Sequence, residues 1–310
     1  MELSLIIIQK IFIMFLLALV GYICAKITIL DQNAIKRIFS LVLKLVTPML
    51  IITSYQMDYD PVIVRNLGIA FALCAVSYVI QIGLAFLLVP KQKDGGERYR
   101  LERLCMIFAN CGFFGIPLIH SLYGEEGTIY ITATIAVFNI LLWAVGIPIL
   151  TGKPSLKQTV KNLFSPATVA TILGVGLLLL KIRLPELVME PIRMIGSMNT
   201  PLAMIAAGAT IAGTKLAPAL KNLRVYYVTL GKMLIIPAFS VLIYWLIPAP
   251  SILRIIQILA IACPVAAACP MLALLCDKDE GFCSQNFAVT TLVSIVSIPL
   301  IFIMAKALGI

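Results

Sequence analysis

Long apolar stretches separated by short polar connections run along almost the whole chain. Most stretches are about 20 residues long, which is the length of helix that crosses the hydrocarbon core of a bilayer. The pattern predicts ten spans, at residues 5–25, 35–55, 67–89, 101–123, 128–150, 166–180, 198–213, 225–247, 252–276 and 283–308. No small-residue cleavage site follows the first span, so we expect it to remain in the mature protein. The chain is therefore predicted to be an all-α polytopic membrane protein.

The second half of the chain repeats the first. A shift of 151 to 153 residues brings similar segments into register. Three prolines of the first half then fall on three of the second half: Pro48 on Pro201, Pro117 on Pro270 and Pro148 on Pro299. The repeat predicts two five-span halves, residues 1–150 and 151–310. Because five is an odd number, the second half must enter the membrane in the opposite sense, as in the inverted repeats of secondary transporters.

Spans four and nine are expected to be interrupted helices. Residues 109–117 read Ala-Asn-Cys-Gly-Phe-Phe-Gly-Ile-Pro, and residues 262–270 read Ala-Cys-Pro-Val-Ala-Ala-Ala-Cys-Pro. Proline removes a backbone donor and glycine adds conformational freedom, so regular helical bonding should fail there. Each proline alone could simply kink its helix against a neighbour. Breaks at equivalent positions of two repeats instead predict a cavity, in which two half-helix N-termini favour an anion such as a carboxylate.

Residues 110–127, Asn-Cys-Gly-Phe-Phe-Gly-Ile-Pro-Leu-Ile-His-Ser-Leu-Tyr-Gly-Glu-Glu-Gly, resemble the fourth-helix signature of the auxin efflux carrier family, which includes plant PIN proteins and bacterial permeases. Cys263-Pro264 and the run 290–300 resemble that family's ninth and tenth helices. The resemblance implies ten helices in a 5+5 inverted repeat with broken, crossing helices 4 and 9, as in bile-acid transporters and sodium/proton antiporters. It places the family's crossover Asn at Asn110 and its crossover Pro at Pro264.

The same resemblance implies an alternating-access, elevator-type carrier. Spans 1, 2, 6 and 7 would form the supporting part, and spans 3–5 and 8–10 the mobile part. Plant carriers have a Pro before the crossover Asn, where this chain has Ala109, and a long hydrophilic loop where residues 151–165 are short. These departures make a bacterial-type carrier of small organic anions, such as malate, a better match than an auxin carrier.

Composition and charge agree with a membrane location. The chain is 61% hydrophobic and 12% charged, which leaves no room for a soluble catalytic domain. Of its 24 Lys and Arg residues, fifteen lie in one set of alternate connections and six in the other. The protein is predicted to lie in the cell membrane. Since cytoplasmic loops carry the excess of basic residues, both of its termini are predicted to lie outside the cytoplasm. The net charge of +10 then reflects the orientation of the chain in the membrane and not binding to nucleic acid. The loop 94–103, which carries charges of both signs, is expected to be a solvated connection.

The positions of the acidic residues bear on the transported ion. All fourteen fall in connections or at span ends, whereas pumps and antiporters usually use an intramembrane carboxylate. This distribution favours an anion carrier. A cation- or proton-coupled antiporter or symporter of the same fold remains the alternative, with sodium held by backbone carbonyls and hydroxyls such as those of Thr291 or Ser294.

Several polar residues within spans have two interpretations. Lys44 and Lys232 could be functional ammonium groups, but a lysine within a span also commonly extends its head to the membrane surface, which we favour for Lys44. His120 could titrate near neutral pH as an anion or proton contact, but a lone histidine more often makes a packing hydrogen bond. Asn139 could reach the cavity or bond between helices.

The candidate substrate-binding residues lie in the interrupted stretches and near them. They are Asn110, Cys111, Gly112, Gly115, Pro117, His120, Asn139, Cys263, Pro264 and Val265. No cofactor or metal site is expected, and the eight cysteines read as small buried residues. The expected partners are a small organic anion, the lipid bilayer and, as a candidate, a second copy of the chain in a homodimer; no nucleic acid is expected. Known intramembrane catalytic motifs do not occur, so an enzyme is disfavoured, and a receptor without net flux stays open.

Overall fold

Every regular element that the computed structural model of the chain describes is a helix. The structure describes residues 2–91, 97–152, 165–214 and 216–310, and over these ranges the one extended pairing is a single bridge between Ala109 and Val265. Most of the short connection 151–165 and the start of the loop 94–103 lie outside the described residues.

Seven helical stretches in the described part of the chain are long and apolar enough to cross a membrane. They are Ile8–Lys26, Gln32–Tyr55, Pro61–Leu88, Cys111–Thr151, Glu186–Gly213, Leu223–Leu246 and Glu280–Ala307. Two further apolar helices, Pro166–Leu179 and Ser251–Ala262, are shorter. The expected all-α polytopic membrane protein is confirmed, whereas helix length alone does not establish ten crossings.

The difference in count arises where helices break or run together. Cys111–Thr151 contains 41 residues, about 60 Å of helix and thus about twice the hydrocarbon thickness of a bilayer. Gly124 interrupts it with a φ of 60° and a ψ of −145°, a conformation that only glycine adopts readily. The expected fourth and ninth spans are each divided by non-helical residues, at 108–110 and at 263–267.

The chain folds into two compact units, and each unit combines segments from both halves of the sequence. Unit 1 comprises Met1–Phe71, Gly112–Asn139 and Leu163–Gly213; unit 2 comprises Ala72–Cys111, Ile140–Asn162 and Thr214–Ile310. Boundaries fall inside α4 (Pro61–Leu88) and α6 (Ile116–Leu141), so both helices contribute to both units.

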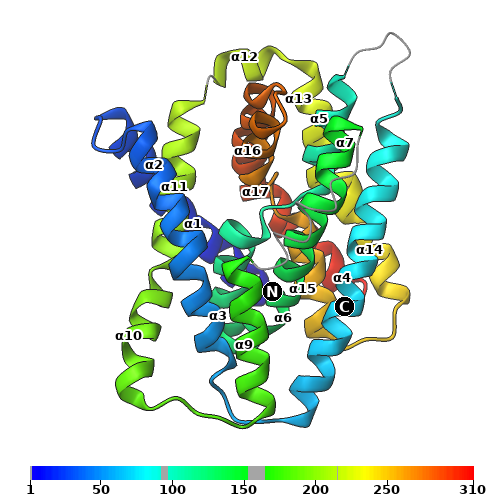
Figure 1. The fold of residues 1–310 in the computed structure, drawn as a ribbon. Helices are drawn as coiled ribbons and strands as arrows, with labels where there is room; N and C mark the ends of the chain where they lie inside the picture. The colour runs from blue at the N-terminus through cyan, green and yellow to red at the C-terminus, as the bar shows by residue number, and fades with distance from the viewer. Residues whose placement is uncertain (1, 92–96, 153–164, 215) are drawn as a thin grey trace. The chain divides into compact units, whose positions relative to one another are not determined.

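Unit 1 contains parts of α4 and α6 and eight further elements. These are α1 (Glu2–Lys26), α2 (Gln32–Leu41), η1 (Val42–Val46), α3 (Thr47–Tyr55), most of η2 (Cys111–Gly115), α9 (Pro166–Leu179), α10 (Glu186–Ser197) and α11 (Asn199–Gly213). α1 runs beside α11 (Figure 1). A Cβ built on Gly21 would lie 2.0 Å from the carbonyl oxygen of Ile205, and one on Gly208 would lie 1.7 Å from that of Ala18. The two backbones therefore approach as closely as small residues allow in membrane helix pairs.

Elsewhere in unit 1, α3 packs against α9 and α10. The phenol of Tyr55 and the hydroxyl of Thr132 lie 2.7 Å apart in a buried hydrogen bond. The Thr47 hydroxyl donates to Oδ1 of Asn199 at 2.8 Å, also in a buried position. These two bonds pair buried polar groups within the unit, as a membrane interior requires, whereas Nδ2 of Asn199 has no partner among the described residues.

Unit 2 is built around the long helix α17. Its elements, besides parts of α4 and α6, are α5 (Arg98–Ile107), η3 (Leu142–Gly146), α7 (Ile147–Thr151), α12 (Leu216–Lys221), α13 (Leu223–Leu230), η4 (Gly231–Ile235), α14 (Ile236–Leu246), α15 (Ser251–Ala262), α16 (Ala268–Leu275) and α17 (Glu280–Ala307). α17 contacts α5, α12, α13, η4, α14, α15 and α16. α16 and α17 lie side by side in Figure 1.

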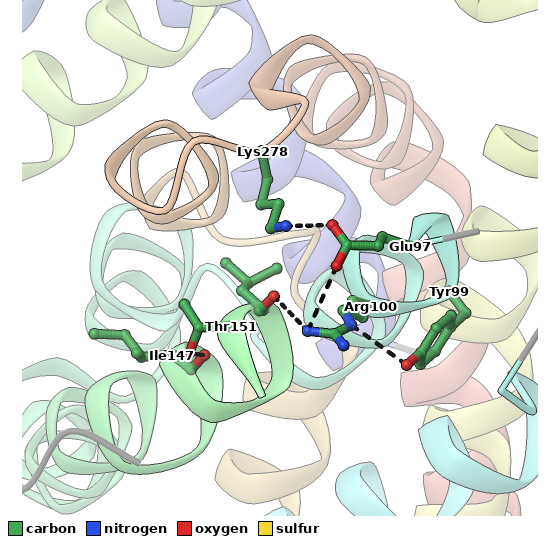
Figure 2. Close-up of polar contacts among 7 residues, drawn as sticks. Glu97, Tyr99, Arg100, Ile147, Thr151 and Lys278 are labelled. Atoms are coloured by element: carbon green, nitrogen blue, oxygen red, sulfur yellow. Dashed lines mark hydrogen bonds and ion pairs between the residues drawn. The ribbon is translucent and has the colours of Figure 1, made fainter. Parts of the chain in front are cut away.

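Charged side chains join three segments of unit 2 (Figure 2). Lys278, in the connection between α16 and α17, forms an ion pair with Glu97 just before α5. The same carboxylate lies 3.9 Å from Nη1 of Arg100. Nη1 of Arg100 in turn donates to the carbonyl oxygen of Leu150 in α7 at 2.8 Å. The ends of α5, α7 and α16 are therefore linked through one arginine and one carboxylate.

Four π-helical segments occur in the described residues, and each one ends two residues before a proline. The prolines are Pro48 after η1, Pro117 after η2, Pro148 after η3 and Pro237 after η4. A proline clashes with the carbonyl four residues earlier, so a locally wider turn accommodates its ring without ending the helix. In proteins generally, single π-helical turns of this kind are frequent at functional sites.

Candidate functional site

The two broken helices of unit 2 are joined at their breaks by main-chain hydrogen bonds. The N–H of Asn110 donates to the carbonyl oxygen of Pro264 at 2.8 Å, and the N–H of Ala266 donates to that of Phe108 at 2.9 Å. The two bonds together form the single antiparallel bridge found among the described residues. Polar backbone groups freed by one break are thus paired with those of the other, which burial in a membrane protein demands.

The first break lies just upstream of the residues expected to cause it. Gly112 and Gly115 belong to η2, and Pro117 lies in the first turn of α6. α6 continues η2 without a gap, so Pro117 is the seventh residue of a helix that starts at Cys111, and the wider π turn before it accommodates its ring. The helix therefore resumes at Cys111, whereas in the second stretch Pro264 lies within the break itself.

A hydroxyl of α17 closes the second break. The N–H of Val265 donates to Oγ1 of Thr290 at 3.0 Å, and this hydroxyl donates its own proton to the carbonyl oxygen of Asn286 at 2.6 Å. All three residues are buried. The hydroxyls of Thr291 and Ser294, singled out from the sequence as sodium ligands, donate to carbonyl oxygens within α17.

Two donors at the junction have no partner in the described part of the chain. The side chain of Asn110 is buried, with 4% of the residue exposed, and its amide forms no hydrogen bond to another described residue. The backbone N–H of Ala109 likewise has no acceptor among the described residues. Buried donors of this kind are normally satisfied by protein, water or a ligand.

The thiols beside the junction do have partners. Sγ of Cys111 lies 3.6 Å from the carbonyl oxygen of Ala260, and Sγ of Cys263 lies 3.3 Å from that of Leu259. Both cysteines are buried. They line the junction as small, weakly polar groups.

A lysine ammonium is buried in unit 2 near the joined breaks. Lys232 lies in η4 and is 0% exposed. Its Nζ donates to Oε1 of Gln81 at 3.1 Å, and the thiols of Cys111 and Cys263 are among its electrostatic neighbours. No carboxylate of the described residues lies within ion-pair distance of this ammonium. Full burial excludes extension of this side chain to the membrane surface, the other interpretation of Lys232.

A buried hydrogen-bond network holds the partner of Lys232 in place. Nε2 of Gln81 donates to the carbonyl oxygen of Ser77 at 3.3 Å. The hydroxyl of Ser77 lies 2.5 Å from that of Tyr244 and 3.2 Å from Oε1 of Gln257, and it has one proton to share between these two acceptors. Tyr244 donates to the carbonyl oxygen of Leu73 at 2.7 Å. The carbonyl of Ser77, one turn earlier in α4, thus orients the Gln81 amide, and the Ser77 hydroxyl links α4 to α14 and α15.

The family model described as "Membrane transport protein" matches residues 6–302. The chain belongs to this membrane transport protein family. The match confirms the resemblance to auxin efflux carriers that the fourth and ninth spans carry. A protein of Methanothermobacter thermautotrophicus described as an uncharacterized transporter is 24% identical over 291 residues, which are 92% of this chain and 93% of that protein.

Five of the predicted site residues of this membrane transport protein belong to unit 1. They are Gly112, Gly115, Pro117, His120 and Asn139. The ring Nδ1 of His120 lies 3.0 Å from the hydroxyl of Thr128. This contact fits the packing role that is common for a lone histidine. Asn139 is half-buried, and the predicted roles of these five residues remain predictions.

Glu102 of the transporter is more deeply buried than its place near a span end indicates. It lies in α5 with 0% of the residue exposed. Oε2 of Glu102 is 3.7 Å from Nη1 of Arg224, and neither carboxylate oxygen has a hydrogen-bond partner among the described residues. No sequence pattern indicated this burial, because α5 carries charged residues on either side of Glu102.

The cysteines form no metal site in the part of the transporter that is described. All eight are free, and Sγ of Cys105 lies 3.7 Å from Sγ of Cys283. No group of three His, Cys, Asp or Glu side chains among the described residues is arranged to hold a metal ion.

Proposed function

We propose that this membrane transport protein is a secondary carrier of small organic anions, such as malate or an auxin-like acid, and that it has no catalytic activity. The observation that carries the proposal is the junction of the two breaks in unit 2. There, the side-chain amide of Asn110, a residue that is 4% exposed, and the N–H of Ala109 lack partners among the described residues. Donors without acceptors match the oxygen atoms of a carboxylate.

The interrupted helices add to this preference. The N-terminus of a helix exposes N–H groups and carries about half a positive charge. η2 begins directly after the first break, and α16 directly after the second. We propose that both helix starts face the bound anion, with Cys111, Cys263, Pro264 and Val265 of unit 2 forming its immediate surroundings.

We further propose the ten-span, 5+5 inverted-repeat fold with helices 4 and 9 crossing at their breaks. Two hydrogen bonds support it, because they join residues one repeat apart. Thr47 and Asn199 in unit 1 are 152 residues apart, and Gln81 and Lys232 in unit 2 are 151 residues apart. A two-fold axis brings residues that lie on it into contact with their own counterparts. The break at Gly124 supports reading Cys111–Thr151 as two crossings.

Transport would follow an alternating-access, elevator-type cycle. Unit 1 contains the whole of expected spans 1, 2, 6 and 7, and unit 2 the whole of expected spans 8–10. Spans 3, 4 and 5 are divided between the units. In the proposed cycle spans 3–5 and 8–10 move together and carry the junction with its anion across the barrier.

Uptake by purified protein in liposomes tests the proposal. Radiolabelled malate and indole-3-acetate are the probes, and their uncharged amides are the competitors that should not inhibit. Asn110→Ala should reduce uptake roughly 10- to 100-fold, because a hydrogen bond to a charged group contributes about 1.5–3 kcal/mol.

Asn199→Ala is the matched control. Asn199 is buried to a similar degree but lies in unit 1, where its Oδ1 accepts a hydrogen bond from Thr47 and its Nδ2 has no partner among the described residues. This variant should lose thermal stability and keep its uptake rate per folded molecule. If the wild type takes up neither radiolabelled malate nor radiolabelled indole-3-acetate, the proposed function is overturned. Unchanged uptake by Asn110→Ala would remove Asn110 from the site.

The buried Glu102 favours a second candidate, in which transport is coupled to protons or sodium. A buried carboxylate without hydrogen-bond partners is a typical proton carrier in membrane transporters. Uptake that rises with an imposed proton or sodium gradient in the wild type, and no longer does so in Glu102→Gln, would support coupling. Gradient-independent uptake in both proteins would exclude it.

A further inference from the structure

The charge of Lys232 has no counter-charge within its reach. The residue is fully buried in a membrane protein, and no carboxylate of the described residues pairs with it. Ionisable groups inside membrane proteins are costly, and they normally pair with one another or face the path of a charged substrate. The other ionisable groups around this ammonium are thiols, at Cys105, Cys111, Cys263 and Cys269. A neutral thiol does not balance a positive charge.

The hydrogen bonds of Lys232 are also incomplete. An ammonium has three donors, and one of them reaches Oε1 of Gln81. Gln81 is neutral, and its own amide nitrogen donates to the carbonyl oxygen of Ser77 one turn earlier in α4. The oriented amide therefore holds the ammonium on a neutral acceptor, and two of the three ammonium donors are left for another group.

The ammonium lies close to the joined breaks. Cys111 and Cys263, which follow Asn110 and precede Pro264, are both within electrostatic range of it. A Cβ on Gly231, the residue before Lys232, would lie 2.7 Å from Cε of Met106 in α5. The absence of a side chain at Gly231 thus lets η4 pack directly on the helix that ends at the first break.

We propose that Lys232 supplies the positive charge that pairs with the transported carboxylate, and that Gln81 holds the ammonium between transport events. The inference rests on the proposed function and names the charged partner in that site. The ligand class is an organic anion with at least one carboxylate. An ammonium next to one carboxylate leaves no net charge in the loaded site, so a monocarboxylate is fully compensated and a dicarboxylate keeps one negative charge.

The repeat makes this arrangement asymmetric. Gln81 and Lys232 are 151 residues apart and occupy matching positions of the two halves. The first half contributes a neutral amide and the second an ammonium. One positive charge therefore lies where the two halves of the sequence meet within unit 2. A single ammonium at this position would pair with a single anion.

Substitution of the neutral partner gives the most informative test. Gln81→Glu would place a carboxylate on the Lys232 ammonium, which should preserve folding and neutralise the site. Binding of malate and indole-3-acetate, followed by the rise in thermal unfolding temperature of the purified protein, should weaken roughly a hundredfold, as when one partner of a buried charge pair is lost. A role of Lys232 in packing alone predicts unchanged binding, because the new ion pair keeps the lysine in place.

Lys232→Met and Lys44→Met form a matched pair of variants. Both lysines lie in π-helical segments that precede a proline, but Lys44 is exposed. Lys232→Met should lose binding and uptake, and Lys44→Met should keep both. If Lys232→Met does not fold, Gln81→Glu decides the question by itself.

The outcomes separate this inference from the proposed function. Wild-type protein that binds and transports neither probe overturns both. Wild-type protein that transports a carboxylate, together with Gln81→Glu or folded Lys232→Met that binds it with unchanged affinity, overturns the role of Lys232 and leaves the carrier function standing.

Discussion

At the scale of single residues, Thr290 has two tasks that only a hydroxyl performs together. It accepts a hydrogen bond from the N–H of Val265 in the second break, and it donates to the carbonyl oxygen of Asn286 in its own helix. Thr291, the next residue, only donates to a carbonyl within α17. Substitution of each threonine in turn can therefore distinguish a hydroxyl that supports the break from one that only bonds within its own helix.

Thr290→Val should destabilise the protein by about 1–3 kcal/mol, because it leaves the buried N–H of Val265 without an acceptor. Valine keeps the shape of the side chain, so no cavity forms. Thermal unfolding of the purified protein measures the change. Thr291→Val, the control, removes a donor whose carbonyl acceptor also serves the helix, and it should change stability by less. Equal losses in both variants would show that Thr290 does not support the break.

Residue identity alone could not separate Lys44 from Lys232. Both lie within predicted spans, and both precede a proline in a π-helical segment. The structure exposes Lys44 and buries Lys232 completely. The difference comes from tertiary packing, since η4 contacts α5, α15 and α17 and is enclosed by them. The same limit applies to Thr290, whose importance depends on which backbone group lies opposite its hydroxyl.

At the scale of elements, the packing of α1 against α11 depends on a seam, the contact at Gly21 and Gly208 where the two backbones approach without intervening side chains. Gly21 and Gly208 each face a carbonyl oxygen of the other helix at a distance that leaves no space for a Cβ. Inside lipid the hydrophobic effect does not drive helices together, so the van der Waals contacts of this close approach stabilise the pair instead. The seam fixes the separation of the two helices.

Gly208→Ala should therefore destabilise unit 1 by about 1–3 kcal/mol, as overpacking of a tight contact does. Gly176→Ala in α9 is the matched control, because nothing lies within 4 Å of its added Cβ. Without a clash, alanine in a helix is favoured over glycine by about 1 kcal/mol. Thermal unfolding should thus move in opposite directions for the two variants, and a shift in the same direction would contradict the close seam.

The ion pair shown in Figure 2 should make the link between α5 and the α16–α17 connection sensitive to acid. The hydrogen bond from Lys278, together with its charge, holds the pKa of Glu97 below the ordinary value of 4.5. A lowered pKa in the folded state means that Glu97 stabilises the fold above pH 4.5 and that this contribution is lost as the pH falls through the folded-state pKa.

Thermal unfolding of wild type and Glu97→Gln between neutral and acidic pH measures this dependence. The variant should be less stable at neutral pH, and the difference should shrink on acidification. The effect is small because both side chains are partly exposed. In a Lys278→Gln background the substitution Glu97→Gln should change the stability less, because only the longer contact of Glu97 with Arg100 remains. An undiminished change there would show that Lys278 does not contribute to the effect.

Sequence patterns located the elements better than the joints between them. Apolar length placed the spans, and proline with glycine placed the interruptions to within a few residues. The first break nevertheless begins at Phe108, before Gly112 and Pro117, because the wider turn of η2 accommodates the proline within the following helix. The bond between Asn110 and Pro264 joins residues far apart in the chain, and no local pattern specifies such a partner.

At the scale of the whole molecule, the distribution of basic residues predicts an orientation. Fifteen Lys and Arg residues lie in one set of alternate connections and six in the other. The first set includes Lys221, and the second includes Arg183; both residues are exposed. From this count the positive-inside rule predicts that both chain termini lie outside the cytoplasm.

Labelling of single cysteines checks this orientation in a variant whose eight native cysteines are replaced. Arg183→Cys should react with a membrane-impermeant maleimide in intact cells. Lys221→Cys should react only after the cells are made permeable. The reverse pattern would place both termini in the cytoplasm and would remove the charge count as a guide to this chain's topology.

The bond between the two breaks consists of main-chain atoms alone, from Phe108 and Asn110 on one side and Pro264 and Ala266 on the other. Replacing a side chain at 109, 110 or 265 leaves both hydrogen bonds in place, apart from proline at 110, which has no N–H to donate. Selection can therefore alter the chemical groups offered to a solute while the supporting framework stays constant. Divergence of selectivity among relatives with the same architecture would need only such local exchanges.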